Sequence, residues 1–195
     1  KYPIFGYEYP EFVKIYESKA NMKEYESGPR KGERIDPYAK KHQFFGTVPS
    51  RQIYGLQRLK ELVDLPSLER IQLELKEKQN KSYRESLLEQ QKELQLDCVF
   101  ICSGGSDGLN VASLGYDVIW LNSETTQIDY NQYKLLKTIC KTIYNIPDTD
   151  YVGTKMGTKL GLTFLDIKTI WLPDHVQETK KDIADYIRSF DSFET

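Results

Sequence analysis

The sequence predicts an α/β fold with a parallel sheet of about four strands flanked by helices. A small N-terminal α+β lobe and an inserted helical arm are expected in addition. Two observations carry this prediction. Short apolar runs alternate with helical patterns from residue 96 onward, and a densely charged segment separates them from a polar, aromatic N-terminal part. The expected division is a lobe at 1–66, an arm at 67–95 and an α/β domain at 96–195.

The N-terminal lobe shows strand and turn patterns. Phe12–Tyr16 alternates apolar and polar residues, as a half-buried strand does. The polar stretch Ser27–Lys41 contains Gly-Pro and Asp-Pro pairs that favour a loop. The short segments His42–Gly46 and Gln52–Leu56 follow, and the second leads into a short helix.

The arm has a different pattern. Twelve of the residues from Glu69 to Glu93 are charged, six of each sign, and leucines recur at helical spacing. Ser82-x-x-Glu85 matches a capping box, a pattern that marks the start of a helix. We therefore expect two helices that are separated near Asn80.

The α/β domain is expected to contain four buried strands with a helix after each. Continuously apolar runs of this length are typical of strands that are covered on both faces. The predicted strands are Val99–Cys102, Asp117–Leu121, Thr142–Ile146 and Lys168–Leu172. The predicted helices run through Leu109–Leu114, 130–140, 154–165 and roughly Lys181–Phe190.

Composition argues against membrane, collagenous, disordered and disulfide-scaffold proteins. The 195 residues carry 27 Lys and Arg against 29 Asp and Glu, and 39% are apolar, as in globular proteins. No apolar run approaches the roughly 20 residues that span a bilayer, so no membrane partner is expected. Three cysteines and two histidines argue against a zinc site and for a reduced, cytoplasmic setting. The start at Lys1 indicates a fragment of a longer chain.

Charge is unevenly distributed along the chain. Residues 1–60 carry 12 basic and 7 acidic side chains, a net charge of +5, and the remaining 15 basic and 22 acidic side chains give −7. A basic lobe next to an acidic domain is consistent with a protein that holds a polyanion near metal-binding carboxylates. A merely solvated surface explains the same asymmetry.

Acidic and small residues follow the predicted strands, where ligands of parallel α/β sheets bind. The first strand leads into Ser103-Gly104-Gly105-Ser106-Asp107-Gly108, and the third into Asp148-Thr149-Asp150. Two carboxylates one residue apart can share a hard divalent cation, which takes oxygen ligands and keeps several waters. Turn chemistry alone also accounts for an Asp-x-Asp sequence.

These residues resemble the motifs of Toprim domains. Ser103-Gly104-x-x-Asp107-x-Leu109 is similar to the first motif, which has Glu in place of Ser, and Asp148-x-Asp150-x-x-Gly153 is similar to the second. Lys181-Asp182-x-x-Asp185 resembles an element near the end of the domain in bacterial (DnaG-type) primases. Tyr54-Gly55-Leu56 is similar to the segment that precedes their Toprim core. The resemblance covers about 42–66 and 96–190.

The resemblance implies a DNA primase-like protein that acts in DNA replication of a phage, mobile element or bacterium. It implies Mg²⁺ or Mn²⁺ as cofactor, with Asp148 and Asp150 as main ligands and Asp107 and Asp182 beside them. Implied partners are single-stranded template, nucleotides and a replicative helicase or other replication protein. Such a primase also needs a surface for single strands, which cations and stackable rings provide. The residues expected to form it are Lys14, Arg30, Lys31, Arg34, Lys40, Lys41, Arg51 and Tyr54.

Ser103 departs from the family pattern at the position of the catalytic Glu. A hydroxyl cannot serve as acid or base near pH 7 without assistance, so turnover is left open. We hypothesise that Glu124, beyond the second strand, replaces some of the missing charge; a surface glutamate is the alternative. A nucleic-acid-binding or regulatory module without catalysis is therefore a second reading of the same sequence.

A third reading is an α/β-hydrolase. Gly104-Gly105-Ser106-Asp107-Gly108 satisfies the G-x-S-x-G pattern of a nucleophile elbow, and it follows a predicted strand. Asp150 and His175 follow in the required Ser-Asp-His order. The charged arm before the elbow argues against this reading, because several sheet strands normally precede it.

Overall fold

The computed structural model describes residues 4–9, 11–17, 19–49, 52–122, 126–173 and 182–191, the last four by their backbone only. The chain forms two compact units, Lys1–Ser50 and Arg51–Thr195. The boundary thus lies at 50/51 rather than at 66. The residues that follow it join the sheet of the second unit, which accounts for the difference.

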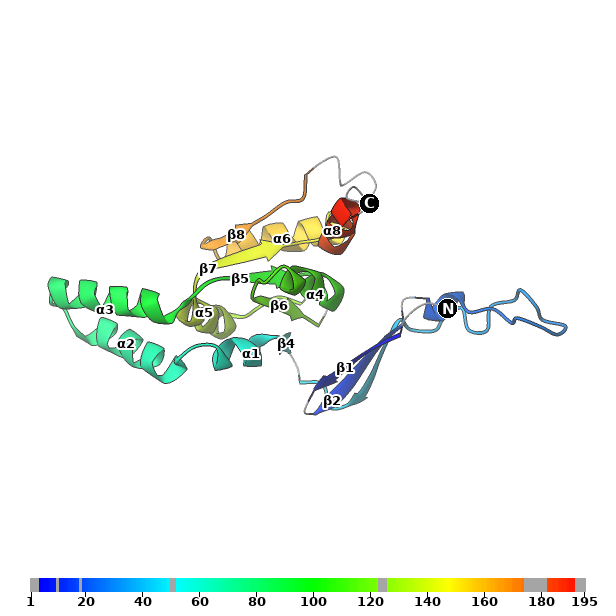
Figure 1. Cartoon of the computed structure of the whole chain (residues 1–195), viewed down its shortest axis with the longest axis horizontal. Helices are drawn as coiled ribbons and strands as arrows, with labels where there is room; N and C mark the ends of the chain where they lie inside the picture. Colours follow the sequence, from blue (N-terminus) through cyan, green and yellow to red (C-terminus); the bar gives the residue numbers. More distant parts are fainter. Residues whose placement is uncertain are drawn as a thin grey trace. The chain divides into compact units, whose positions relative to one another are not determined.

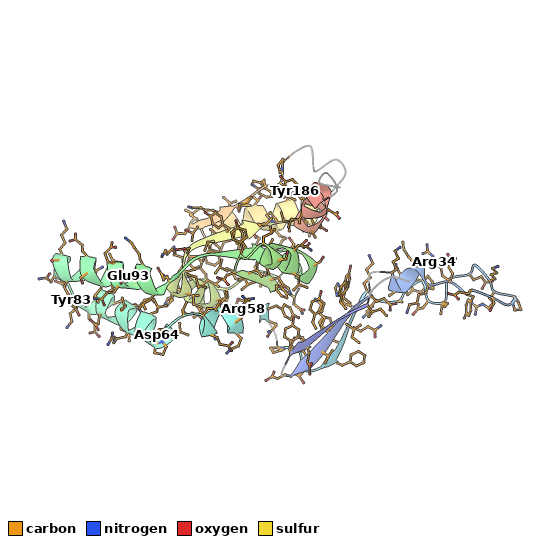
Figure 2. The ribbon with its side chains drawn as sticks, in the orientation of Figure 1. Arg34, Arg58, Asp64, Tyr83, Glu93 and Tyr186 are labelled. Carbon is orange, nitrogen blue, oxygen red and sulfur yellow. The ribbon has the colours of Figure 1, made fainter. Side chains whose placement is uncertain are left out.

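The N-terminal unit contains a three-stranded antiparallel sheet. Its order is β1 (Ile4–Tyr9), β2 (Phe12–Glu17) and β3 (His42–Gly46), and a 3-10 helix, η1 (Ala20–Met22), follows β2. The predicted strands at β2 and β3 are present, whereas the sequence analysis assigned no strand to β1. The loop between β2 and β3 is held by an isolated bridge between Glu24 and Arg34; Figure 2 labels Arg34.

The second unit is built on a five-stranded sheet (Figure 1). The order is β4 (Ile53–Tyr54), β6 (Val118–Leu121), β5 (Leu96–Cys102), β7 (Cys140–Ile146) and β8 (Ile167–Thr169). Only β4 runs antiparallel to its neighbour; the other four are parallel. The predicted fold class is confirmed, with β4 as an added edge strand and β8 ending at Thr169 instead of Leu172.

Helices cover both faces of this sheet. Leu59, Leu136 and Leu160 belong to one core cluster with Val99 and Ile143, and they come from α1 (Leu56–Glu61), α5 (Tyr130–Ile139) and α6 (Tyr151–Thr163). The opposite cluster combines residues of β5 and β6 with α4 (Gly105–Ser113) and α8 (Ile183–Asp191). Alternate residues along each strand therefore face different helices, which is why most residues of the central strands are apolar.

The arm is an antiparallel helical hairpin of α2 (Leu65–Glu77) and α3 (Lys81–Leu94), shown side by side in Figure 1. Asp64 and Asn80 cap these helices by accepting bonds from backbone amides. The predicted break is therefore present, but the cap is Asn80 and not Ser82. Tyr83 donates a hydrogen bond to Glu74 across the hairpin, and Figure 2 labels Tyr83 and Asp64.

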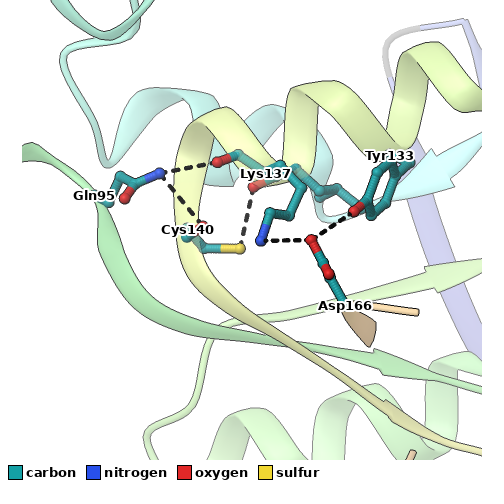
Figure 3. Close-up of polar contacts among 6 residues, drawn as sticks. Gln95, Tyr133, Lys137, Cys140 and Asp166 are labelled. Carbon is teal, nitrogen blue, oxygen red and sulfur yellow. Dashed lines mark hydrogen bonds and ion pairs between the residues drawn. The ribbon is translucent and has the colours of Figure 1, made fainter. Parts of the chain in front are cut away.

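A polar network fixes the amino edge of the sheet (Figure 3). The Gln95 amide, just before β5, donates to the carbonyls of Lys137 (2.9 Å) and Thr138 (3.0 Å) at the end of α5. Asp166, just before β8, accepts from the Tyr133 hydroxyl at 3.1 Å and pairs with Lys137 at 3.4 Å. These hydrogen bonds lower the pKa of Asp166. Three elements are thus joined at the edge opposite to the predicted site.

Within the described residues, every helix is too short or too polar to cross a membrane.

Candidate functional site

The turns that follow β5 and β7 meet at one edge of the sheet. The two strands are parallel neighbours, and their last residues, Cys102 and Ile146, are paired in the register. The backbone amide of Asp148 donates a hydrogen bond to the Ser103 hydroxyl oxygen at 3.0 Å. The glycine-rich bend and the Asp-x-Asp turn are therefore in direct contact, as the sequence predicted for a shared site.

Asp150 forms the N-terminal cap of α6. One of its carboxylate oxygens accepts the Gly153 amide at 2.9 Å. The positive end of the helix dipole stabilises the carboxylate at this position. Asp150 thus has a structural role that does not require a metal ion.

Gly153 is required by the turn that carries the two aspartates. A Cβ atom at this position would lie 2.4 Å from the Asp148 carbonyl oxygen and 2.7 Å from the Asp148 Cβ. Real Cβ atoms do not approach backbone so closely, so a larger residue would displace Asp148. The glycine in the Asp-x-Asp-x-x-Gly pattern therefore allows the chain to fold back tightly enough to place both carboxylates on the rim.

Asp107 lies in the first turn of α4 and is only 6% exposed. One of its carboxylate oxygens accepts the Ala184 amide of α8 at 3.4 Å. The charges of two predicted ligands, Asp107 and Asp148, both act on the Cys102 thiol. Burial raises its pKa to about 12, with further contributions from the charges of Asp107 and Asp148. Both carboxylates thus act on the same end of β5.

Asp182 caps α8, since its carboxylate accepts the Asp185 amide at 2.7 Å. Two predicted ligands, Asp107 and Asp182, thus both accept backbone amides at the start of this helix. Sequence reasoning assigned them to a metal and did not foresee the role in holding α8. An aspartate followed three positions later by a further acid, as in Asp182-x-x-Asp185, is the helix-start signal that could have shown it.

The donor set can be compared with what a divalent cation requires. In the described part of the chain, no three or more His, Cys, Asp or Glu side chains lie close enough to hold an ion together. The four aspartates therefore form no ready-made cage. Mg²⁺, however, is commonly held by one or two carboxylates together with waters and phosphate oxygens. Asp148 and Asp150, which are both half-exposed on the rim, could supply that minimum.

The remaining candidate catalytic residues are Ser103, Glu124 and the Ser106–His175 pair of the hydrolase alternative. Ser103 is engaged with the Asp148 amide, and Glu124 lies outside the described residues. Ser106 is exposed in the first turn of α4, whereas His175, its predicted partner in a hydrolase, lies outside the described residues.

The predicted nucleic-acid residues are divided between the two units. Lys14 is buried in the middle of β2, and Arg51 lies outside the described residues. Arg30 pairs with Glu33 at 2.8 Å and lies over the Tyr25 ring at 4.6 Å. The other predicted cations of the N-terminal unit are exposed: Lys31, Arg34, Lys40 and Lys41.

Tyr54 requires a correction. Its side chain is 0% exposed, stacks on Trp120 and donates a hydrogen bond to Asn122 at 2.8 Å. The pairing of β4 with β6 buries it in the second unit. Tyr54 is therefore a core residue and offers no surface to a base.

Sequence reasoning missed Asn145. It lies within β7, is 6% exposed, and its side-chain nitrogen has no hydrogen-bond partner among the described residues. It lines a cavity of about 40 Å³ together with Ser103, Gln127 and Gly153. The lining is mainly apolar, and Ser103, Gln127 and Asn145 are polar groups within it that an ordered water could bridge. The only sequence signal was a polar residue inside an otherwise apolar strand.

Comparison with known proteins supports the fold. No family model matches the sequence, and no curated protein is significantly similar to it. The structure is similar to a DNA primase domain from Pseudomonas aeruginosa, with a TM-score of 0.52 and 14% identity over 94% of this chain. The DnaG catalytic core gives a TM-score of 0.48 and 15% identity over 80% of this chain. This chain spans 44% and 43% of those two proteins.

Proposed function

We propose that this chain is a primase-like protein of DNA replication, which binds single-stranded DNA and a divalent metal ion for template-directed primer synthesis. The observation that carries the proposal is the contact between Ser103 and Asp148. It joins the two motif turns on one rim of a sheet that resembles a primase domain. A phage, a mobile element or a bacterium, with the protein in the cytoplasm, is the proposed setting.

Asp148 and Asp150 would hold the metal ion in this proposal, with Asp107 and Asp182 near the rim. A bound Mg²⁺ or Mn²⁺ would offset negative charge on the phosphates of the incoming nucleotide. The protein's own contribution is to fix the two carboxylates by the Asp150 cap and the tight turn at Gly153. The proposed partners are template, nucleotides and a replicative helicase or another replication protein.

One observation favours a second candidate, a nucleic-acid-binding module without catalysis. Ser103 stands where Toprim domains have Glu, and its hydroxyl already accepts the Asp148 amide. No other described acidic side chains complete a metal-binding group at the rim. The fold and the basic N-terminal unit would then serve binding alone.

Primer synthesis on a single-stranded template with Mg²⁺ or Mn²⁺ separates the two candidates. The full chain and the Asp148→Asn variant are compared, because this change removes one charge and keeps the size of the side chain. Product that is lost in the variant supports the enzyme. Retained DNA binding without any product, in both proteins and with both metals, supports the binding module.

A further inference from the structure

One face of the β1–β2–β3 sheet is composed almost entirely of rings. Residues paired across antiparallel strands lie on the same face, so the register assigns each side chain to a face. Three rows result on this face: Phe5, Tyr16 and His42; Tyr7, Lys14 and Phe44; Tyr9, Phe12 and Gly46. We call these residues the aromatic face. Lys14 lies at its centre.

The rings of the aromatic face are arranged as neighbouring stacked pairs. Tyr9 and Phe12 have centroids 4.6 Å apart with planes 20° from parallel, and Tyr16 and His42 are 4.8 Å apart at 21°. The outer rings keep accessible surface, 46% for Phe5 and 39% for Phe44. A set of partly exposed, roughly parallel rings is the surface on which unstacked bases bind.

Lysine side chains lie among the rings of the aromatic face and next to it. The Lys14 ammonium lies 5.6 Å from the centroid of the Phe44 ring. Burial and the charges of Lys14 and Lys41 lower the pKa of His42, so His42 takes part as a neutral ring near pH 7. Lys40 and Lys41 are exposed directly before β3, where they can meet phosphates.

The opposite face of the sheet has a different character. Phe45 pairs with Val13, and Ile15 pairs with Gln43, so this face holds one ring among aliphatic and polar side chains. In the described part of Lys1–Ser50 the only helix is the short η1, so no longer helix of that unit covers either face. The two faces thus differ in the types of residue that they carry.

We infer that the aromatic face binds single-stranded DNA by stacking bases on its outer rings, with the exposed Lys40 and Lys41 supplying positive charge for the phosphates. The inference rests on the proposed function and specifies where the strand is held. Duplex DNA keeps its bases stacked on each other and so gains nothing from this face. None of the rings needs to recognise a particular base, which suits a protein that follows a template.

Phe44 and Phe45 provide a matched test, because they are adjacent in β3 and point to opposite faces. Phe44→Leu and Phe45→Leu each remove one exposed ring and keep an apolar side chain. Affinity for a fluorescein-labelled oligothymidine is measured by anisotropy with the full chain, and thermal unfolding of each variant checks folding. Phe44→Leu should weaken binding at least about fivefold. Phe45→Leu should change it by less than about twofold.

Several results would overturn the inference. These are equal affinities of the two folded variants, a wild-type chain that does not bind the oligonucleotide, or an equal loss of duplex binding in Phe44→Leu. Sedimentation of the same proteins adds another: a dimer that Phe44→Leu dissociates without any change in DNA affinity would identify the face as a protein interface. The primer-synthesis assay is read separately. Absent product with binding that depends on Phe44 would reject the primase and keep the aromatic face.

Discussion

The Ser103 hydroxyl accepts the backbone amide of Asp148 at 3.0 Å, which links the bend after β5 to the turn after β7. This bond orients the start of the Asp-x-Asp turn from the neighbouring strand. The bond also occupies one of the two acceptor positions of the Ser103 hydroxyl oxygen. Ser103 therefore orients the turn that carries Asp148 and Asp150.

Asp150 allows its capping role to be separated from a metal role. Asp150→Asn keeps a side-chain oxygen for the Gly153 amide and removes the charge, whereas Asp150→Ala removes both. We expect the free energy of unfolding of Asp150→Asn to lie within about 0.5 kcal/mol of the wild-type value, and that of Asp150→Ala to be about 1 kcal/mol lower than wild type. Urea titration measures both. Both variants should lose Mn²⁺ binding, as followed by electron paramagnetic resonance. Unchanged Mn²⁺ binding in Asp150→Asn would limit this residue to capping.

Gly153→Ala tests the tight turn under the aspartates. Gly to Ala in a helix ordinarily stabilises by up to about 1 kcal/mol. At Gly153 the added Cβ would meet the Asp148 carbonyl oxygen at 2.4 Å, so we expect a loss of about 1–3 kcal/mol instead. Gly161→Ala in the same helix is the control, because its Cβ would meet only the Thr169 hydroxyl at 3.3 Å. Equal stabilities of the two variants would contradict the turn as described.

Much of the α/β domain could be predicted because its signals are local. Apolar runs mark β5 and β7 and gave the strands directly. The helix caps were harder to predict, because short polar side chains serve turns, caps and metal sites alike: Asp150 was assigned to a metal, and the cap expected at Ser82 lies at Asn80. Since parallel strands end at one edge, the meeting of the two turns followed from the strand order alone.

Long-range pairing determined what the sequence did not reveal. β4 has two residues, too few for any periodicity, and only its pairing with β6 buries Tyr54. The same holds for the aromatic face, because a strand pattern shows alternation within β2 but not which residues of β1 and β3 join it. Asp107 and Asp182 matched a metal motif, and the contact with α8 that occupies them depends on tertiary packing.

Two buried thiols predict that the free energy of unfolding falls at alkaline pH. Burial raises the pKa of both Cys102 and Cys140 to about 12, from a value near 9 for an accessible thiol. A raised pKa favours the folded state below pH 9, and this contribution is lost as pH rises from 9 to 12, because only the unfolded chain releases the proton. Each thiol should lower the unfolding free energy by about 1.4 kcal/mol per pH unit in that range.

Cys102→Ala isolates this effect from other titrating groups. The variant is less stable at every pH because the substitution leaves a cavity. Its free energy of unfolding should, however, fall less steeply between pH 9 and 12 than that of wild type, by the contribution of one thiol. Urea unfolding at several pH values gives both slopes. Parallel declines would mean that the Cys102 thiol ionises as readily in the folded chain as in the unfolded one.

Ser103→Glu tests whether the rim can accept the carboxylate that the resemblance to Toprim motifs implies at this position. Without metal, the new charge lies beside Asp148 and the bond from its backbone amide is altered, so we expect the variant to be about 1–2 kcal/mol less stable than wild type. With millimolar Mn²⁺, a third carboxylate near Asp148 and Asp150 should bind the ion more tightly and restore the loss, because an ion that binds only the folded state stabilises it. Ser103→Gln is the matched control, since it has the same size without the charge; because it keeps Asp148 and Asp150, Mn²⁺ should stabilise it too, but less than it stabilises Ser103→Glu. Thermal unfolding of both variants with and without Mn²⁺ measures the difference. If Mn²⁺ stabilises neither variant, the two turns do not form a metal-binding rim. An equal shift of both variants would mean that a carboxylate at position 103 does not join the site.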